Sequence, residues 1–141
     1  MDLGLQDKVA FIAAASQGLG RAVADELAAE GASLVICSRD QQKLDRVAQE
    51  IEAKTGSRVA AIAADLSLAK DIENAIAHGI ERFSKIDILV TNNGGPPAGK
   101  FETLSAESWD DAYRGLLTSV LDMTRLVLPG MKQRTRGRPL M

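Results

Sequence analysis

Few residues in this sequence could form a disulfide or hold a metal ion. It has one cysteine, Cys37, and one histidine, His78. A single cysteine cannot form an internal disulfide, and no neighbouring thiol or second histidine is present to complete a metal site. We therefore interpret Cys37 as a buried strand residue and predict no metal site.

Long apolar runs and a large net charge are also lacking. No run approaches the roughly 18 apolar residues of a membrane span, and the start, MDLGLQDK, lacks the basic and apolar parts of a signal peptide. The net charge of -2 would repel polyanionic partners on average, which argues against nucleic-acid and membrane-surface binding. We expect a cytoplasmic protein.

Only the C-terminal end is locally basic. Lys132, Arg134, Arg136 and Arg138 lie within a few residues of one another. We predict that residues 132–141 form a solvated tail rather than a nucleic-acid-binding arm. The preceding residues, 1–131, are expected to form one domain, because a chain of 141 residues with 45% hydrophobic residues is typical of a single globular unit.

Short apolar runs alternate with longer segments of helical spacing. The runs lack in/out alternation, which is typical of parallel strands covered on both faces. The predicted strands are residues 9–15, 33–38, 58–64 and 87–91. Amphipathic helices are predicted at residues 18–30, 41–54, 68–83 and, after a glycine- and proline-containing loop, 106–128.

This order of elements predicts the fold class. Strands that alternate with helices, joined by right-handed crossovers, form an α/β doubly wound parallel sheet of the Rossmann type, with three layers in the order αβα. The pattern ends after the fourth strand and a long helix, so we expect a truncated sheet of order 3-2-1-4. Its fourth strand would then be an open edge.

The sequence AAASQGLG, after the first strand, has the composition of a phosphate-binding turn. Phosphates bind where a strand ends and a helix begins, because the first N–H groups of the helix have no internal partners. Gly18 and Gly20 would allow the backbone to approach a ligand closely, and Ser16 offers a hydroxyl. Such a turn also occurs for steric reasons alone, so its neighbours must decide.

One such neighbour is Arg39, which ends the second strand about 20 residues beyond the glycines. At this place a dinucleotide fold meets the adenosine ribose, where an acidic residue binds the 2′-hydroxyl and an arginine the 2′-phosphate. Arg39 therefore favours NADP over NAD. The adjacent Asp40 would favour the opposite choice, and a surface arginine at a helix start is the structural alternative.

These motifs together resemble the short-chain dehydrogenase/reductase family over almost the whole chain. The likeness rests on the glycine turn, on ADLS at residues 64–67, on NNGG at 92–95, and on ESWDDAY at the start of the last helix. CSRD, at residues 37–40, is similar to NADP-preferring members, and the chain as a whole to 3-oxoacyl-carrier-protein reductases. The resemblance implies these cofactor-binding residues: Ala14, Ser16, Gln17, Gly18, Leu19, Gly20, Ser38, Arg39, Asp65, Leu66, Asn92, Asn93 and Gly94.

Within this resemblance Asp65 would bind the adenine amino group, with Leu66 beside it, and the Asn92–Gly94 segment would support the central strand and pass the middle of the cofactor. The bland alternatives are a helix cap at Asp65 and an ordinary turn at the asparagines.

Two positions depart from the family pattern. The family's Thr-Gly pair falls on Ala13 and Ala14, so a methyl group stands where the backbone turns tightly. If that position needs a positive φ, alanine costs about 1 kcal/mol. The family's catalytic asparagine falls on Leu116, which cannot hydrogen-bond and which we interpret as part of an apolar helix stripe.

The family's catalytic serine and Tyr-x-x-x-Lys pair are not found in the sequence. The single tyrosine, Tyr113, is followed four residues later by Leu117. Without the tyrosine no acid delivers a proton to the nascent alkoxide. Pro139 also lacks the N–H that a central strand needs. A truncated gene, a frameshift or a fragment would each explain this, and we assign no catalytic residue.

The resemblance therefore predicts an NADP-dependent short-chain oxidoreductase, present as its cofactor-binding half and inactive alone. Its intact relatives would act on a small-molecule carbonyl substrate. Self-association is expected, because the last helix carries a large apolar stripe and packs against its counterpart in intact relatives. The alternative is a non-catalytic nucleotide-binding or assembly module.

Overall fold

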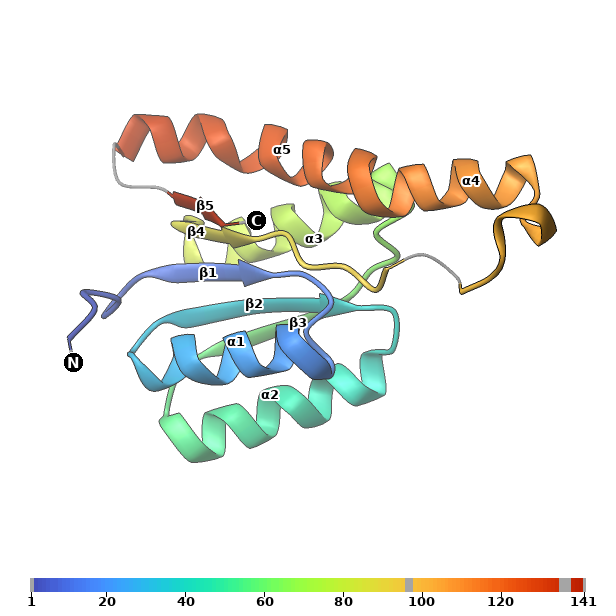
Figure 1. The fold of residues 1–141 in the computed structure, drawn as a ribbon. Helices are drawn as coiled ribbons and strands as arrows, with labels where there is room; N and C mark the ends of the chain where they lie inside the picture. The colour runs from blue at the N-terminus through green and yellow to red at the C-terminus, as the bar shows by residue number, and fades with distance from the viewer. Residues whose placement is uncertain (1, 96–97, 135–137, 141) are drawn as a thin grey trace.

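The structure is a computed structural model that describes residues 2–95, 98–134 and 138–140. Strands and helices alternate along the first two thirds of the chain, and helices dominate the remainder (Figure 1). The elements are β1 (Val9–Ile12), α1 (Gly18–Ala29), β2 (Ser33–Ser38), α2 (Gln41–Thr55), β3 (Val59–Ala63), α3 (Ala69–Phe83), β4 (Ile88–Val90), the 3-10 turn η1 (Phe101–Thr103), α4 (Ala106–Tyr113), the π-helical segment η2 (Arg114–Thr118), α5 (Ser119–Arg134) and β5 (Arg138–Leu140).

All strand pairs are parallel, and the sheet has the order β3-β2-β1-β4-β5. Helices α1 and α2 cover one face, while α3 and α5 cover the other (Figure 1). This arrangement confirms the predicted doubly wound, three-layer αβα fold. The predicted strands and the first three helices agree with the observed ones to within a few residues at each end.

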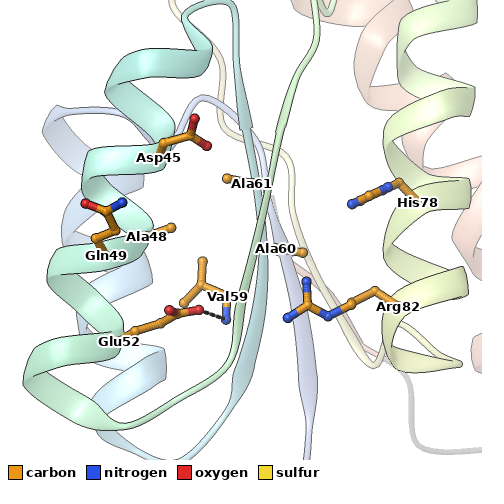
Figure 2. Close-up of a pocket in the computed structure, with 9 residues that line it drawn as sticks. All are labelled: Asp45, Ala48, Gln49, Glu52, Val59, Ala60, Ala61, His78 and Arg82. Carbon is orange, nitrogen blue, oxygen red and sulfur yellow. Dashed lines mark hydrogen bonds between the residues drawn. The ribbon is translucent and has the colours of Figure 1, made fainter.

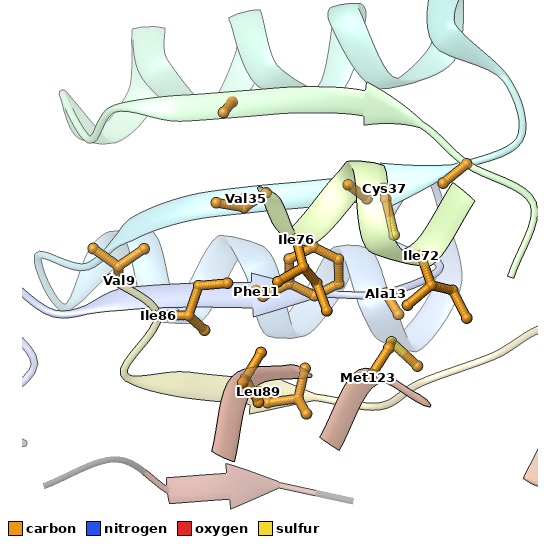
Figure 3. Packing of buried hydrophobic residues seen from close by; sticks show 14 of the residues in the cluster. Val9, Phe11, Ala13, Val35, Cys37, Ile72, Ile76, Ile86, Leu89 and Met123 are labelled. Carbon is orange, nitrogen blue, oxygen red and sulfur yellow. The ribbon is translucent and has the colours of Figure 1, made fainter. Parts of the chain in front are cut away.

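The central strand β1 sends alternate side chains to the two faces. Phe11 packs with Val35, Ile76, Leu89 and Met123 beneath α3 and α5 (Figure 3). Its neighbours on β1 face the other layer and join the buried residues of α1 and α2. Both faces of the sheet are therefore buried, which explains the apolar runs without alternation.

Cys37 is a buried strand residue, as predicted. Burial raises the pKa of its thiol to about 12, against which an N–H hydrogen bond from Ala14 acts only weakly. The thiol is therefore protonated and unreactive at neutral pH.

The predicted open edge at the fourth strand is wrong. A short fifth strand, β5, pairs with β4 and places Pro139 opposite Leu89. The argument against Pro139 in a strand assumed a central position, whereas β5 is the edge of this sheet. An edge strand can lack one N–H because its outer side has no ladder to maintain.

The last helix also differs from its predicted range. It is divided into α4, η2 and α5, and it continues to Arg134, so part of the predicted basic tail is helical. The reason is a tertiary contact: the guanidinium of Arg134 donates to the backbone carbonyl of Ile86 and lies 3.5 Å from Asp87. Arg136 lies outside the described residues.

Asp87 holds together the end of the sheet where the strands begin. Its carboxylate accepts a hydrogen bond of 2.9 Å from the Val9 N–H and lies 3.0 Å from the Lys85 ammonium. Burial alone would raise the pKa of Asp87, but these contacts and Arg134 outweigh it and hold the pKa below its ordinary value. One carboxylate thus joins β1, β4 and the C-terminal turn of α5.

Candidate functional site

A cleft of about 780 Å³ opens at the carboxyl ends of the strands. Loops after β1, β2, β3 and β4 form its floor, and α4 with η2 forms its far wall. Every residue of the predicted cofactor site except Gly20 lines it, which sequence alone did not require. The lining residues are Ala14, Ser16, Gln17, Gly18, Leu19, Ser38, Arg39, Asp40, Lys43, Ala64, Asp65, Leu66, Ser67, Asn92, Asn93, Gly94, Gly95, Asp111, Ala112, Gly115 and Leu116.

Ala14 has a φ of 52°, in the left-handed region that favours glycine. The condition set by the sequence is therefore met: the position needs a positive φ, and alanine there is strained by about 1 kcal/mol. The neighbouring Ala15 N–H donates to the carbonyl of Cys37 at 3.1 Å, which keeps the turn attached to β2. The chain forms the turn without the family's first glycine.

Helix α1 begins with free N–H groups beside the cleft. Its N-cap residue, Gln17, makes no side-chain cap, and no acidic residue stands in the first turn. Gly18 has a φ of 62° and open space where a side chain would project. Because helix N-termini attract anions, this end can accept a phosphate.

Gly20 has a packing role. A Cβ added there would lie 2.2 Å from the Ala14 carbonyl oxygen and 2.9 Å from the Asn92 amide nitrogen. Helix α1 can therefore approach the end of β1 only because this residue has no side chain. Gly20 is buried behind the turn and shapes the cleft without lining it.

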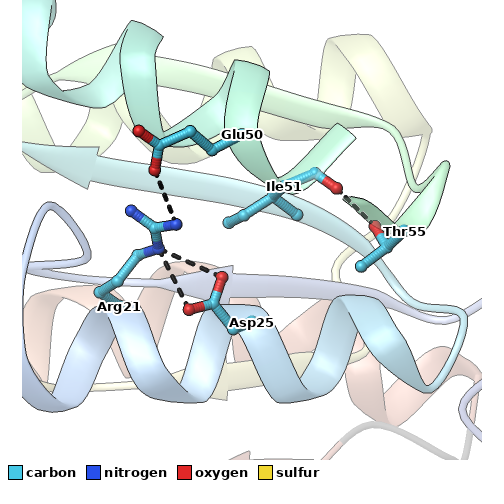
Figure 4. A network of polar contacts seen from close by, with 5 residues as sticks. All are labelled: Arg21, Asp25, Glu50, Ile51 and Thr55. Carbon is cyan, nitrogen blue, oxygen red and sulfur yellow. Dashed lines mark hydrogen bonds and ion pairs between the residues drawn. The ribbon is translucent and has the colours of Figure 1, made fainter. Parts of the chain in front are cut away.

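Arg21, one turn along the same helix, fixes α1 against α2. Its guanidinium lies 3.1 Å from Asp25 and 2.9 Å from Glu50 (Figure 4). Half-exposed ion pairs of this kind contribute little stability, but they set the relative position of the two helices that flank the cleft entrance.

Two cations stand at the end of β2. Arg39 and Lys43 both line the cleft, and among the described residues neither forms an ion pair within 4 Å. The adjacent Asp40 is already engaged, since its carboxylate accepts the Lys43 N–H at 3.1 Å and caps α2. Lys43 was missed by sequence analysis, although its place one helical turn after Arg39 would have revealed it.

Asp65 faces the same cleft from the end of β3. Its carboxylate accepts the hydroxyl and the N–H of Ser67 at 2.6 and 2.9 Å. These hydrogen bonds, led by that of the hydroxyl, lower the pKa of Asp65, and the charge of Arg39 lowers it further. Asp65 does not cap α3, whose N-cap is Leu68. It is therefore an ionised acceptor at the mouth of the cleft.

The asparagine segment connects two strands. The Asn92 side-chain amide donates to the Ala14 carbonyl at 3.3 Å, so the turn after β1 is tied to the loop after β4. Asn93 and Gly94 continue the cleft lining beyond this contact.

The far wall belongs to the helix whose regular pattern is interrupted. Leu116, which the sequence analysis placed in an apolar stripe, is half-buried and lines the cleft instead. It lies in the π-helical segment η2, and such segments are frequent at functional sites. Asp111 and Gly115 lie on the same wall and were not predicted.

A second, smaller groove of about 290 Å³ follows the free edge of β3 (Figure 2). Side chains of α2 occupy that edge: Glu52 accepts the Val59 N–H at 3.0 Å, and the Gln41 amide bonds Ala61 and Ala63. These contacts shield the strand from pairing with another chain. His78 lines this groove, and no metal-binding cluster occurs among the described residues.

Comparison with known proteins identifies the family. The short chain dehydrogenase model matches residues 8–139, so the chain belongs to that family. The chain is 43% identical over 135 residues to 17-beta-hydroxysteroid dehydrogenase type 3 of Danio rerio, covering 92% of this chain and 43% of that protein. It is 35% identical to Dehydrogenase/reductase SDR family member 4 of Caenorhabditis elegans, covering 94% and 51%. The chain thus spans about half the length of the curated relatives it matches.

Solved structures agree. L-sorbose reductase from Gluconobacter frateurii, complexed with NADPH and L-sorbose, superimposes with a TM-score of 0.94 at 30% identity, covering 99% of this chain and 53% of that one. A metagenomic short-chain oxidoreductase in complex with NADP gives 0.88 at 31% identity, covering 96% and 61%. None of the helices that the described residues form has the length and apolarity to cross a bilayer.

Proposed function

We propose that this chain binds NADP in the cleft at the carboxyl ends of its strands, as the cofactor-binding half of a short-chain oxidoreductase. The observation that carries the proposal is the pair of cations, Arg39 and Lys43, beside the uncapped N-terminus of α1. A dianionic 2′-phosphate needs such cations, whereas a 2′-hydroxyl would need a free carboxylate. The nearest one, on Asp40, is used to cap α2.

The donor set fits the whole dinucleotide. Arg39, Ser38 and Lys43 would hold the phosphorylated ribose, and the carboxylate of Asp65 would accept from the adenine amino group. The N–H groups of α1 would receive the diphosphate. The cofactor, when bound, supplies a nicotinamide ring that exchanges hydride with a carbonyl or alcohol carbon.

The same proposal includes inactivity of the isolated chain. A carbonyl accepting hydride must also receive a proton, and the 141 residues contain no Tyr-x-x-x-Lys pair to provide it. Tyr113, the single tyrosine, is exposed on α4 and does not line the cleft. We therefore expect cofactor binding without ketone reduction. NADPH consumption with a ketone panel above the uncatalysed rate would contradict this.

Calorimetric titration of NADPH and NADH tests the cofactor assignment. NADPH should bind more tightly than NADH, and Arg39→Ser should weaken NADPH binding about ten- to a hundredfold, because a charge-assisted contact is worth about 1.5–3 kcal/mol. NADH binding should change little. The control is Arg46→Ser, an exposed arginine of α2 outside the cleft. Equal binding of both nucleotides, unaffected by Arg39→Ser, would contradict NADP preference.

The alternative function, an assembly module, has one observation in its favour. Large apolar side chains at four-residue intervals remain exposed along the last helix: Trp109, Tyr113, Leu117 and Leu121. We expect this stripe to pair with a second copy of the chain. Sedimentation should detect a dimer that Leu117→Glu disrupts. A dimer without nucleotide binding would favour the assembly module, and a monomer would remove its support.

Some finer assignments remain proposals of the same kind. The substrate of an intact relative would be a small-molecule carbonyl compound, and the protein would reside in the cytoplasm. The division into a domain of residues 1–131 and a separate tail is retained only as a hypothesis about folding units, which limited proteolysis would test.

A further inference from the structure

The two ends of the cleft carry opposite charges. Arg39 and Lys43 stand where β2 ends, and Asp111 stands on the far wall formed by α4 and η2. Asp65, the other carboxylate considered for the cofactor, lies at the Arg39 end, where it feels the arginine charge. Asp111 is therefore an acidic group that the proposed phosphate and adenine contacts do not use.

Asp111 is placed to act on a ligand in the cleft. It lies on one face of the last helix together with Ala112, Gly115 and Leu116, which also line the cleft. It is solvent-exposed, and among the residues that the structure describes no cation lies within 4 Å of its carboxylate. Its charge is therefore not cancelled locally.

The order of the sheet gives the direction of a bound dinucleotide. Strands β2, β1 and β4 are neighbours, so the cleft passes from Arg39 across the glycine turn to Asn93 and then to the far wall. Neighbouring strands are about 4.8 Å apart, so these strand ends span about 10 Å. With the adenosine at Arg39 and the diphosphate at α1, the nicotinamide end must extend toward Asp111.

We propose that Asp111 sets the preference of the protein for the oxidised over the reduced form of the cofactor. This inference rests on the proposed function. The oxidised nicotinamide ring carries a positive charge and the reduced ring is neutral, while the rest of the molecule has the same charge in both. A nearby carboxylate attracts only the charged ring, so it stabilises NADP⁺ relative to NADPH.

The size of the effect follows from Coulomb's law. An exposed carboxylate several ångströms from a unit charge, in a partly hydrated cleft, changes a binding constant by about two- to fivefold. The effect should weaken as salt is added, because a Debye length is about 10 Å at 0.1 M ionic strength.

The test compares binding of NADP⁺ and NADPH by the full 141-residue chain, using calorimetry at low ionic strength. Asp111→Asn should lower the ratio of NADP⁺ affinity to NADPH affinity two- to fivefold, almost entirely through weaker NADP⁺ binding. The matched control is Asp110→Asn, which removes the same charge from the next residue of α4, an exposed residue outside the cleft lining. Asp111→Lys should move the ratio further in the same direction.

Each outcome decides the matter. A fall in the ratio for Asp111→Asn, absent in Asp110→Asn and reduced by salt, supports the proposal. Unchanged ratios, or equal changes in the two variants, overturn it while leaving cofactor binding intact. If the unaltered chain binds neither nucleotide, the proposed function itself has failed, and this inference with it. Thermal unfolding of each variant confirms that the exposed substitutions leave the fold unchanged.

Discussion

The two ends of the parallel sheet are built on opposite principles. Where the strands begin, Asp87 is buried and surrounded by the Val9 N–H, Lys85 and Arg134, so its charge is compensated. Where they end, Arg39 and Lys43 stand without ion pairs and α1 begins without a side-chain cap. The first end is arranged for stability, and the second leaves polar groups available to a ligand.

The comparison predicts its largest effect at Asp87. Asp87→Ala should lower the free energy of unfolding by about 3 kcal/mol, because it leaves a buried N–H and two cations without their shared partner. Urea denaturation followed by circular dichroism measures it. The control is Glu73→Ala, which removes an exposed pair with Lys70 and should cost less than about 0.5 kcal/mol. Equal losses in the two variants would remove the distinction between the ends.

A smaller effect is expected from Gly20→Ala at the ligand end. The added methyl would meet the Ala14 carbonyl oxygen at 2.2 Å, which is backbone and cannot rotate away. We expect a loss of about 2 kcal/mol in the free energy of unfolding, together with weaker NADPH binding. Gly115→Ala has nothing within 4 Å and should be nearly neutral in stability. A neutral Gly20→Ala would show that α1 can move away from β1.

The smallest effect should come from Ala14→Gly, and it has the opposite sign. Glycine adopts the φ of 52° without strain, so the variant should be more stable by up to about 1 kcal/mol. The next residue provides the control: Ala15→Gly, at a buried position without positive φ, should destabilise. Destabilisation by Ala14→Gly would show that strain at this turn is not significant.

The sequence predicted the ligand end better than the opposite end. Apolar runs and glycines located the strands, the turn and nearly all of the cleft, because local spacing determines them. The contacts of Asp87 could not be predicted, since they join residues 78 positions apart, as in its bond to Val9. The fifth strand and Arg134 were missed for the same reason: pairing with β4 and reach toward Asp87 are tertiary contacts that override local preference.

Lys43 and Asp111 were missed for a different reason. Both are exposed charged residues on helices, which on sequence alone look like solvated surface. Their place becomes evident only when the helices are positioned around the cleft. The opposite error affected Leu116, because the π-helical segment turns a residue of the apolar stripe toward the cleft wall.

Amide chemical shifts during an NADPH titration test the contrast between the two ends most directly. The account predicts that the backbone amides of Gly18, Leu19, Gly20 and Arg39 shift in proportion to bound nucleotide, while those of Val9 and Asp87 stay in place. Absence of any shift at millimolar NADPH, or larger shifts around Asp87 than around Gly18, would contradict it.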